Sequence, residues 1–230
     1  MKATLKLSSE ERRAAIIQAV RRVFAEKGFH GTTTRELALA ANVSEALLFK
    51  HFPNKEALYS AMQHACCGER ESGKIERLKA LEPSTATLVV MVHLLVSKLA
   101  DKLSPANDDD AIQVRLVLRS LMEDGEFATL LLQRVTAGWF PKVEESLQAA
   151  IEAGDAVAGP VTEKLSAWFV HHLAVALMLY QLPTKAVIDY GMPREQLIRQ
   201  AAWFALRGMG LTEDAIRRNY QSETLAVLEG

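Results

Sequence analysis

A group of polar and aromatic side chains stands in the stretch TTTRELALAANVSEALLFKHFPNKEAL, residues 32 to 58. Near its end an aromatic ring, an ammonium and an imidazole follow one another at Phe49, Lys50 and His51. An exposed Phe beside a Lys and a His is unusual on a solvated helix, and it is better suited to the wall of a DNA groove. The alternative is three short helices that pack together only for stability.

Other groups that could support chemistry are few. Cys66 and Cys67 are adjacent, and neighbouring helix positions do not face each other, so no disulfide is expected between them. Two cysteines fit a reducing, cytoplasmic setting, with redox sensing as the alternative. His171 and His172 would point about 100° apart on a helix, a poor geometry for joint metal binding. Because the known catalytic and nucleotide-binding motifs are missing, the sequence predicts no catalytic residue, metal site or cofactor.

The composition predicts helices. Of the 230 residues 49% are hydrophobic and 24% are charged, and only 12 Gly and 7 Pro interrupt a chain rich in helix-forming residues. The start lacks the apolar run of a signal peptide. The longest nearly apolar run, residues 167–180, is shorter than the roughly 20 residues of a membrane span, so it predicts a buried helix.

Charge is distributed unevenly although the net charge is only -1. Residues 1–60 hold ten of the 27 basic and six of the 28 acidic side chains, which leaves 17 and 22 for the remainder. A basic head on an acidic body fits a head that meets a polyanion, whereas chance variation among solvated faces is the alternative.

The helices that must position residues 49–51 have recognisable ends. Four residues have the types that cap helix N-termini, two of them in S/T-x-x-E capping boxes: Ser8, Thr33, Ser44 and Asn54. Short helices are expected over about 34–41 and 45–51, with Pro53 stopping the second. Small residues would let these two helices cross closely, as in a helix-turn-helix: Ala38, Ala40, Ala41 and Ala46.

From about residue 70 the pattern predicts longer helices. They are expected near 84–103, 107–122, 126–136, 139–153, 160–182, 193–209 and 212–227. Breaks such as GWFP at 138 and LPTKAVIDYGMP at 182 separate them. The predicted fold is all-α, with an N-terminal three-helix helix-turn-helix head and a C-terminal helical bundle.

Residues 9–60 resemble the DNA-binding head of the TetR/AcrR family of bacterial transcriptional regulators. The similarity lies in a helix ending in F-x-x-x-G-F, a Thr-rich loop, an R-E-L-A helix, and V-S-x-A-x-L-F-x-H-F-x-N-K-E-x-L. The remainder agrees with that family only in length and helical character. The resemblance implies a helix-turn-helix DNA-binding domain over residues 1–54 and a ligand-binding and dimerisation domain over residues 55–230.

The resemblance also implies roles in DNA binding, with the helix 45–51 in the major groove. Phosphate contacts are implied for Thr33, Thr34, Ser44, His51 and Lys55. Lys50 would reach phosphate or guanine, and Ala46 would allow a close approach to the groove floor.

Two residues depart from the family pattern. Phe49 stands where the family usually has Tyr, so a phosphate hydrogen bond is replaced by apolar contact. Glu45 stands where small or basic residues are common, and it would accept a hydrogen bond from cytosine. The alternative for Glu45 is a helix-favouring first-turn residue without a role in base reading.

For the body, the resemblance implies a four-helix dimer interface and an inducer pocket. The pairing helices would be 160–182 and 193–209, through Leu165, Phe169, Leu173, Ala176, Tyr180, Leu197, Ala201 and Phe204; the alternative is that these helices are central within a monomer. The candidates for lining the pocket are His93, Met122, Phe127, Trp139, Phe140, Trp168, His171 and His172.

The resulting hypothesis is a repressor that a small, largely apolar inducer releases from a palindromic operator. As a homodimer it would hold two heads one DNA turn apart, and ligand would favour another spacing. The helix near 55–70 would link head and body. The alternatives are a ligand-blind DNA-binding or architectural regulator and an all-α enzyme.

Overall fold

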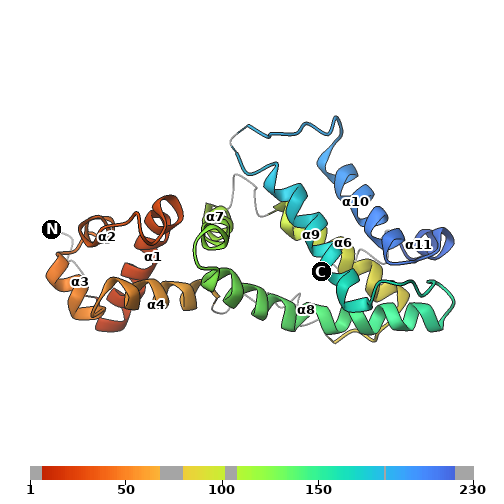
Figure 1. Ribbon diagram of the computed structural model, residues 1–230, viewed down its shortest axis with the longest axis horizontal. Coiled ribbons are helices and arrows are strands. Elements are labelled where there is room, and N and C mark those ends of the chain that lie inside the picture. Colours follow the sequence, from red (N-terminus) through yellow and green to blue (C-terminus); the bar gives the residue numbers. More distant parts are fainter. Residues whose placement is uncertain (1–6, 68–79, 102–107, 184, 221–230) are drawn as a thin grey trace. The chain divides into compact units, whose positions relative to one another are not determined.

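The computed structural model describes residues 7–67, 80–101, 108–183 and 185–220 (Figure 1). Within these ranges the regular elements are α-helices, apart from an isolated bridge between Ala156 and Leu211. The all-α class predicted from composition is therefore confirmed. No helix in the described ranges is long and apolar enough to cross a membrane.

The chain divides into two compact units, each made of two separate stretches of sequence. Met1–Glu69 and Asp109–Gln133 form one, called here the head unit; Arg70–Asp108 and Arg134–Gly230 form the other, the body unit. The head unit therefore includes α4 (Lys55–Cys67) and nearly all of α7 (Asp108–Met122). The functional division expected after residue 54 stays a prediction, because a functional domain and a compact unit need not share a boundary.

The first helices of the head unit begin where the sequence predicts. They are α1 (Ser9–Lys27), α2 (Thr34–Ala40) and α3 (Glu45–His51). Complete capping boxes, at Ser8 and Thr33, satisfy backbone N–H groups that the first turns of α1 and α2 leave unpaired. Gly28 ends α1 at φ 73°, a conformation that costs little for glycine alone.

One apolar cluster holds the head unit together. Its fully buried side chains from α1 to α4 include Phe24, Leu37, Leu48, Phe52 and Met62. Leu116 of α7 and Phe127 of α8 complete the same cluster. Burying each such side chain stabilises the fold by about 1.5–3 kcal/mol. Because Leu116 is buried in this cluster, α7 contributes to the stability of the head unit.

The body unit is built around α6 (Thr85–Asp101), which packs against α9 (Glu163–Leu179) and α10 (Arg194–Gly208) (Figure 1). The middle of α6 is buried on several faces, as its continuous apolar sequence requires. The short α11 (Glu213–Asn219) starts behind Thr212 as predicted. Residues 221–227 of that predicted helix lie outside the described residues.

Helix α8 (Glu126–Glu152) shows that the predicted break at GWFP is wrong. Pro141 lies inside one continuous helix, although proline removes an N–H donor and costs about 3 kcal/mol in a helix interior. Buried side chains flank it, namely Trp139, Phe140, Val143 and Leu147. Packing of this apolar face offsets the lost hydrogen bond, and the sequence pattern alone did not reveal that compensation.

Candidate nucleic-acid interface and body cavity

Helices α2 and α3 are joined by a tight turn. Asn42 takes a positive φ of 53°, and the Val43 N–H donates to the Ala38 carbonyl at 3.0 Å. Leu37, Ala38 and Leu48 are buried where the helices approach. The small side chain of Ala38 permits this close packing, which fixes the orientation of α3.

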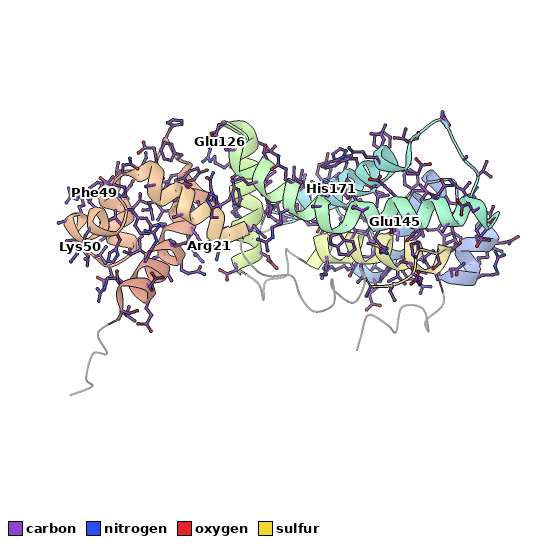
Figure 2. The ribbon with its side chains drawn as sticks, turned by 90° about the horizontal axis from the view of Figure 1, so that it is seen from below. Arg21, Phe49, Lys50, Glu126, Glu145 and His171 are labelled. Carbon is purple, nitrogen blue, oxygen red and sulfur yellow. The ribbon has the colours of Figure 1, made fainter. Side chains whose placement is uncertain are left out.

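The outer face of α3 carries the side chains predicted to point outward. Glu45, Ala46 and Lys50 are exposed, His51 is half-buried, and Phe49 is 42% exposed despite its apolar ring. Figure 2 shows Phe49 and Lys50 at the surface of the head unit. This short helix therefore presents a cation, a carboxylate, an aromatic ring and a methyl group to the outside.

The hydroxyl groups at the starts of α2 and α3 form hydrogen bonds with nearby residues of the head unit. The Thr33 hydroxyl accepts from the Glu36 N–H and donates to the Glu36 carboxylate. Thr34 Oγ1 donates to Glu45 Oε2 at 2.9 Å, which ties the two helix starts together. Ser44 Oγ accepts from the Leu47 N–H at 3.2 Å, a role that does not use its own hydroxyl hydrogen.

Glu36 is the strongly perturbed acid of this region. The Lys27 ammonium, followed by the backbone N–H and hydroxyl of Thr33, lowers the pKa of Glu36 to about 2. The same capping geometry lowers the pKa of Glu11 in α1 through the backbone N–H and hydroxyl of Ser8. Both carboxylates are therefore charged at neutral pH and suit the positive ends of their helices.

Lys55 has a structural role that the sequence did not suggest. Its Nζ donates to the carbonyls of Phe29 at 2.8 Å and Thr32 at 2.9 Å, and it lies 4.2 Å from the centre of the Phe29 ring. Because an ammonium has three N–H donors, one donor remains for the phosphate contact that the sequence predicts. Lys55 therefore fixes the α1–α2 connection to the start of α4.

Arg13 is a second structural residue that sequence reasoning missed. Its NH1 donates to the His51 carbonyl at 2.7 Å, and its guanidinium lies 4.2 Å from the centre of the Phe52 ring. These contacts hold the end of α3 against α1. The residues are 38 positions apart, so no local pattern could have indicated the pairing.

The predicted pocket residues are divided between the two units. Met122 and Phe127 belong to the head unit, where Phe127 is fully buried in the apolar cluster and Met122 is 70% exposed. The sequence prediction of a body pocket at these two residues treats α7 and the first turns of α8 as parts of the body. The packing around Leu116 and Phe127 places that stretch in the head unit instead.

The remaining candidates lie in the body unit and are engaged by other residues. His93 Nδ1 lies 2.5 Å from Tyr220 Oη, and burial lowers the pKa of His93 and raises that of Tyr220 to about 12. Both groups are therefore neutral near pH 7. The side chains of Phe140, Trp168, His171 and His172 make mutual ring contacts, and Trp139 and Phe140 border a cavity of only about 10 Å³. That volume holds about one water molecule.

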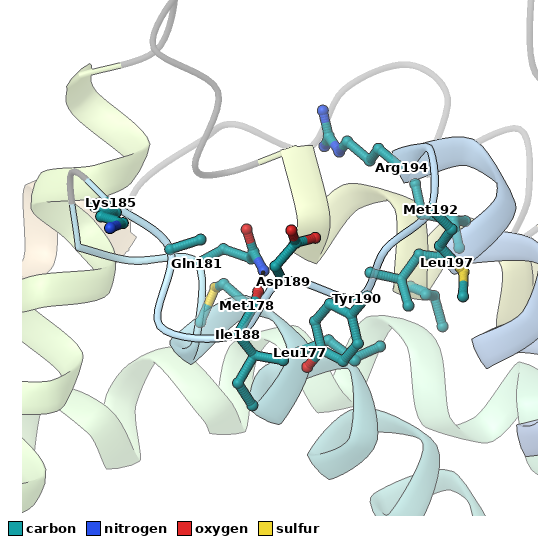
Figure 3. Close-up of a pocket in the computed structure, with 13 residues that line it drawn as sticks. Leu177, Met178, Gln181, Lys185, Ile188, Asp189, Tyr190, Met192, Arg194 and Leu197 are labelled. Carbon is teal, nitrogen blue, oxygen red and sulfur yellow. Dashed lines mark hydrogen bonds between the residues drawn. The ribbon is translucent and has the colours of Figure 1, made fainter.

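A larger cavity, of about 570 Å³, lies elsewhere in the body unit. It is bounded by the end of α9, the start of α10, the segment between them and Val96 of α6 (Figure 3). The sequence interpretation treated this segment, LPTKAVIDYGMP, only as a break between helices. Its mixture of apolar, aromatic and charged residues was the one signal that could have indicated a site.

The proposed pairing helices carry exposed apolar side chains. Leu165 and Phe169 of α9 and Tyr180, which follows α9 directly, are partly exposed, and Phe204 of α10 is 70% exposed. Ala176 is also exposed, whereas Leu173 and Leu197 are half-buried. Ala201 is only 8% exposed and belongs to the body core, so it offers little surface for pairing.

The part of the chain that the structure describes contains no group of three or more His, Cys, Asp or Glu residues able to hold a metal ion.

Comparison with known proteins relates the head to one family. Residues 16–62 match the family model described as bacterial regulatory proteins, tetR family.

The HTH-type transcriptional regulatory protein RaaS of Mycobacterium tuberculosis is 31% identical over 141 residues, 61% of this chain and 58% of RaaS. The uncharacterized HTH-type transcriptional regulator YvkB of Bacillus subtilis is 44% identical over 52 residues, 22% of this chain and 28% of YvkB. The chain thus spans less than two thirds of the length of these curated relatives.

The crystal structure of AibR in complex with isovaleryl coenzyme A and operator DNA is similar over most of its length. The TM-score is 0.59, with 18% sequence identity, over 86% of this chain and 97% of that one. At this level of identity the similarity shows the fold alone.

Proposed function

We propose, from the match of residues 16–62 to the tetR family of bacterial regulatory proteins, that the whole chain is a sequence-specific, DNA-binding transcriptional regulator. The proposed form of action is repression, which the name of one relative supports: the HTH-type transcriptional repressor Rv1474c of Mycobacterium tuberculosis is 31% identical over 118 residues.

The outer face of α3 is the observation that carries the proposal. Glu45, Ala46, Phe49 and Lys50 are exposed on a helix whose opposite face is fixed by the buried Leu48. A short helix held rigidly with polar and apolar groups outward is what major-groove reading requires. The proposed DNA contacts are Thr33, Thr34, Ser44, Glu45, Ala46, Phe49, Lys50, His51 and Lys55.

Dimerisation through α9 and α10 is part of the proposal. A single head covers too few base pairs for tight specific binding, so two heads on a palindromic operator are expected. The partly exposed apolar side chains of Phe169, Tyr180 and Phe204 supply a surface that association would remove from water.

Response to a small molecule completes the proposal. AibR was crystallised with both isovaleryl coenzyme A and operator DNA, and the same fold here contains a cavity of about 570 Å³ in the body unit. A ligand would act only through different affinities for the DNA-binding and non-binding states of the dimer. The second candidate function is a DNA-binding regulator that responds to no ligand.

Footprinting on the protein's own promoter tests the DNA-binding proposal. We expect protection of a palindromic stretch, with affinity that falls steeply as salt rises. If no genomic fragment is protected even at low salt, DNA binding is wrong. If protection is unaffected by any ligand, the ligand-blind regulator is favoured.

A further inference from the structure

The cavity of about 570 Å³ in the body unit is within the size range of small-molecule sites, about 300–1,000 Å³. It is separate from the aromatic group formed by Phe140, Trp168, His171 and His172, because none of these four side chains lines it. The cavity therefore has to be interpreted from its own residues.

Hydrogen bonds among the described residues between α9 and α10 organise the wall of this cavity. The Val187 N–H donates to the Tyr180 carbonyl at 2.8 Å, and Gln181 Nε2 donates to the Ile188 carbonyl at 3.1 Å. The Gly191 N–H donates to Asp189 Oδ1 at 2.9 Å. These three hydrogen bonds hold the Gln181 amide, the Asp189 carboxylate and the backbone at Val187 in place.

Most of the lining is apolar. Side chains from three helices and the connecting segment contribute, namely Val96, Leu177, Met178, Ile188, Met192, Leu197 and Ile198. Figure 3 shows Leu177, Ile188 and Leu197 among the labelled side chains around the cavity. Such a surface favours a ligand whose greater part is hydrocarbon or aromatic.

The polar groups of the lining include two fixed hydrogen-bond acceptors. The Gln181 amide nitrogen donates one of its two N–H groups to the Ile188 carbonyl, which orients Oε1 as an acceptor and leaves one N–H for a ligand. Asp189 follows Ile188 directly, and its second carboxylate oxygen, Oδ2, is not the one that accepts from Gly191. A carboxylate and an amide oxygen are therefore brought to the same part of the lining, as Figure 3 also shows.

The lining also carries two cations, Lys185 and Arg194. Arg194 is exposed, as Gln181 and Asp189 are, and it has an interaction of its own. Lys185 is also exposed, and its long stem lets the ammonium turn toward water. Hydrogen bonds within the segment hold Gln181 and Asp189 in place, and the proposed charge of the ligand is argued from these two side chains.

We propose that this cavity binds an amphipathic organic cation, whose ammonium group is recognised by Asp189 and Gln181 and whose apolar part lies against α6, α9 and α10. Leu197 lines the cavity and also belongs to the proposed pairing surface, so an occupied cavity reaches the dimer interface. An effect of the ligand on dimerisation, and so on DNA binding, rests on the proposed function. Binding of the ligand to the cavity does not.

Calorimetry on the full chain at pH 7 tests the proposal with three probes that share one apolar chain: octylamine, octan-1-ol and sodium octanoate. The Kd of octylammonium should be roughly fivefold lower than that of octanol, because an exposed ion pair contributes a difference of this size. The Kd of octanoate should be the highest of the three. Asp189→Asn should raise the octylammonium Kd to the octanol value. Asparagine can still accept from the Gly191 N–H, so the turn should be kept.

Two further variants act as controls. Lys185→Gln removes a charge from the same segment and should leave the order of the probes unchanged. Ala186→Trp, at an exposed position of the lining, should fill the cavity and abolish binding of all three probes while the far-ultraviolet circular dichroism stays the same.

Tighter binding of octanoate than of octylammonium would overturn the proposed ligand class. Binding that Ala186→Trp leaves unchanged, or no saturable binding of any probe, would overturn the site. Footprinting of the unliganded chain reports DNA binding independently, so an intact footprint without amine binding rejects this site and leaves the proposed function standing.

Discussion

Arg21 of α1 and Asp109 of α7 form an ion pair at 3.3 Å, although they lie 88 positions apart, and the Arg21 side chain is only 10% exposed. Two further contacts reinforce the attachment of α7. Arg119 NH2 donates to the Glu26 carbonyl at 2.8 Å, and Gln113 Nε2 donates to the Cys66 carbonyl at 3.2 Å. Helix α7 is therefore bound to α1 by an ion pair and a hydrogen bond, and to α4 by a hydrogen bond. The link between head and body through the helix near 55–70 stays a prediction.

The first prediction concerns this ion pair. Asp109→Asn leaves a buried guanidinium without its counter-charge, and we expect the head unit to lose about 1 kcal/mol of unfolding free energy, since the Asp109 side chain is 44% exposed and partly screened. A double-mutant cycle with Arg21→Met, followed by urea unfolding, isolates the interaction. A coupling energy of zero would contradict a stabilising pair.

Acid stability should depend on Glu36. Its folded-state pKa of about 2 lies below the ordinary value of 4.5, so its contribution is present above pH 4.5 and is lost as the pH falls toward 2. In the Glu36→Gln variant, the unfolding free energy of the head unit should fall less steeply between pH 4.5 and pH 2 than in the unchanged chain. NMR titration of the side-chain carboxyl carbon measures the pKa directly, and a midpoint near 4.5 would refute the prediction.

The two lysines at the end of the helix-turn-helix should behave differently. Lys55→Met removes two hydrogen bonds to backbone carbonyls, so we expect a loss of about 1–2 kcal/mol in stability besides weaker binding to all DNA sequences. Lys50→Met, the matched exposed control, should change stability by less than about 0.5 kcal/mol. Chemical unfolding and salt titrations of DNA binding separate the two effects; each lost phosphate contact should reduce the salt slope by about 0.9. Equal stability of both variants would rule out the structural role of Lys55.

Base preference is expected to depend on Glu45. Its carboxylate is oriented by the Thr34 hydroxyl, so Glu45→Ala should change the preferred bases at one operator position by about 1–3 kcal/mol. Thr34→Val keeps the carboxylate and removes its anchor, and it should change the preference less. Selection of binding sites from a random DNA pool measures both, and an unchanged consensus for Glu45→Ala would assign Glu45 to the helix N-terminus alone.

Self-association should depend on Phe204. This ring is 70% exposed in the isolated chain, so Phe204→Arg should leave the fold intact and raise the dimer Kd at least about tenfold. Leu121→Arg, at a 61% exposed apolar position of the head unit, is the control and should leave association unchanged. Analytical ultracentrifugation over a concentration series gives the dimer Kd. Dissociation of equal size in both variants would exclude a specific interface at Phe204.

The sequence by itself determined the local structure of the head. The capping residues Ser8, Thr33 and Ser44, the turn at Asn42 and the outward face of α3 all follow from patterns within a few residues, because the hydrogen bonds of caps and turns join near neighbours. The all-helical class follows equally from composition and periodicity. These features needed no knowledge of which helices meet.

Only the tertiary structure decided which surfaces meet. It assigned α7 and Phe127 to the head unit, kept α8 continuous through Pro141, and used Lys55 and Arg13 as structural links. It also formed a cavity at a segment that the sequence interpretation took for a simple break. An apolar stripe specifies that a helix face must be buried but not against which partner, because hydrophobic burial is non-directional. Contacts such as Arg21 with Asp109 arise only after packing has selected the neighbours.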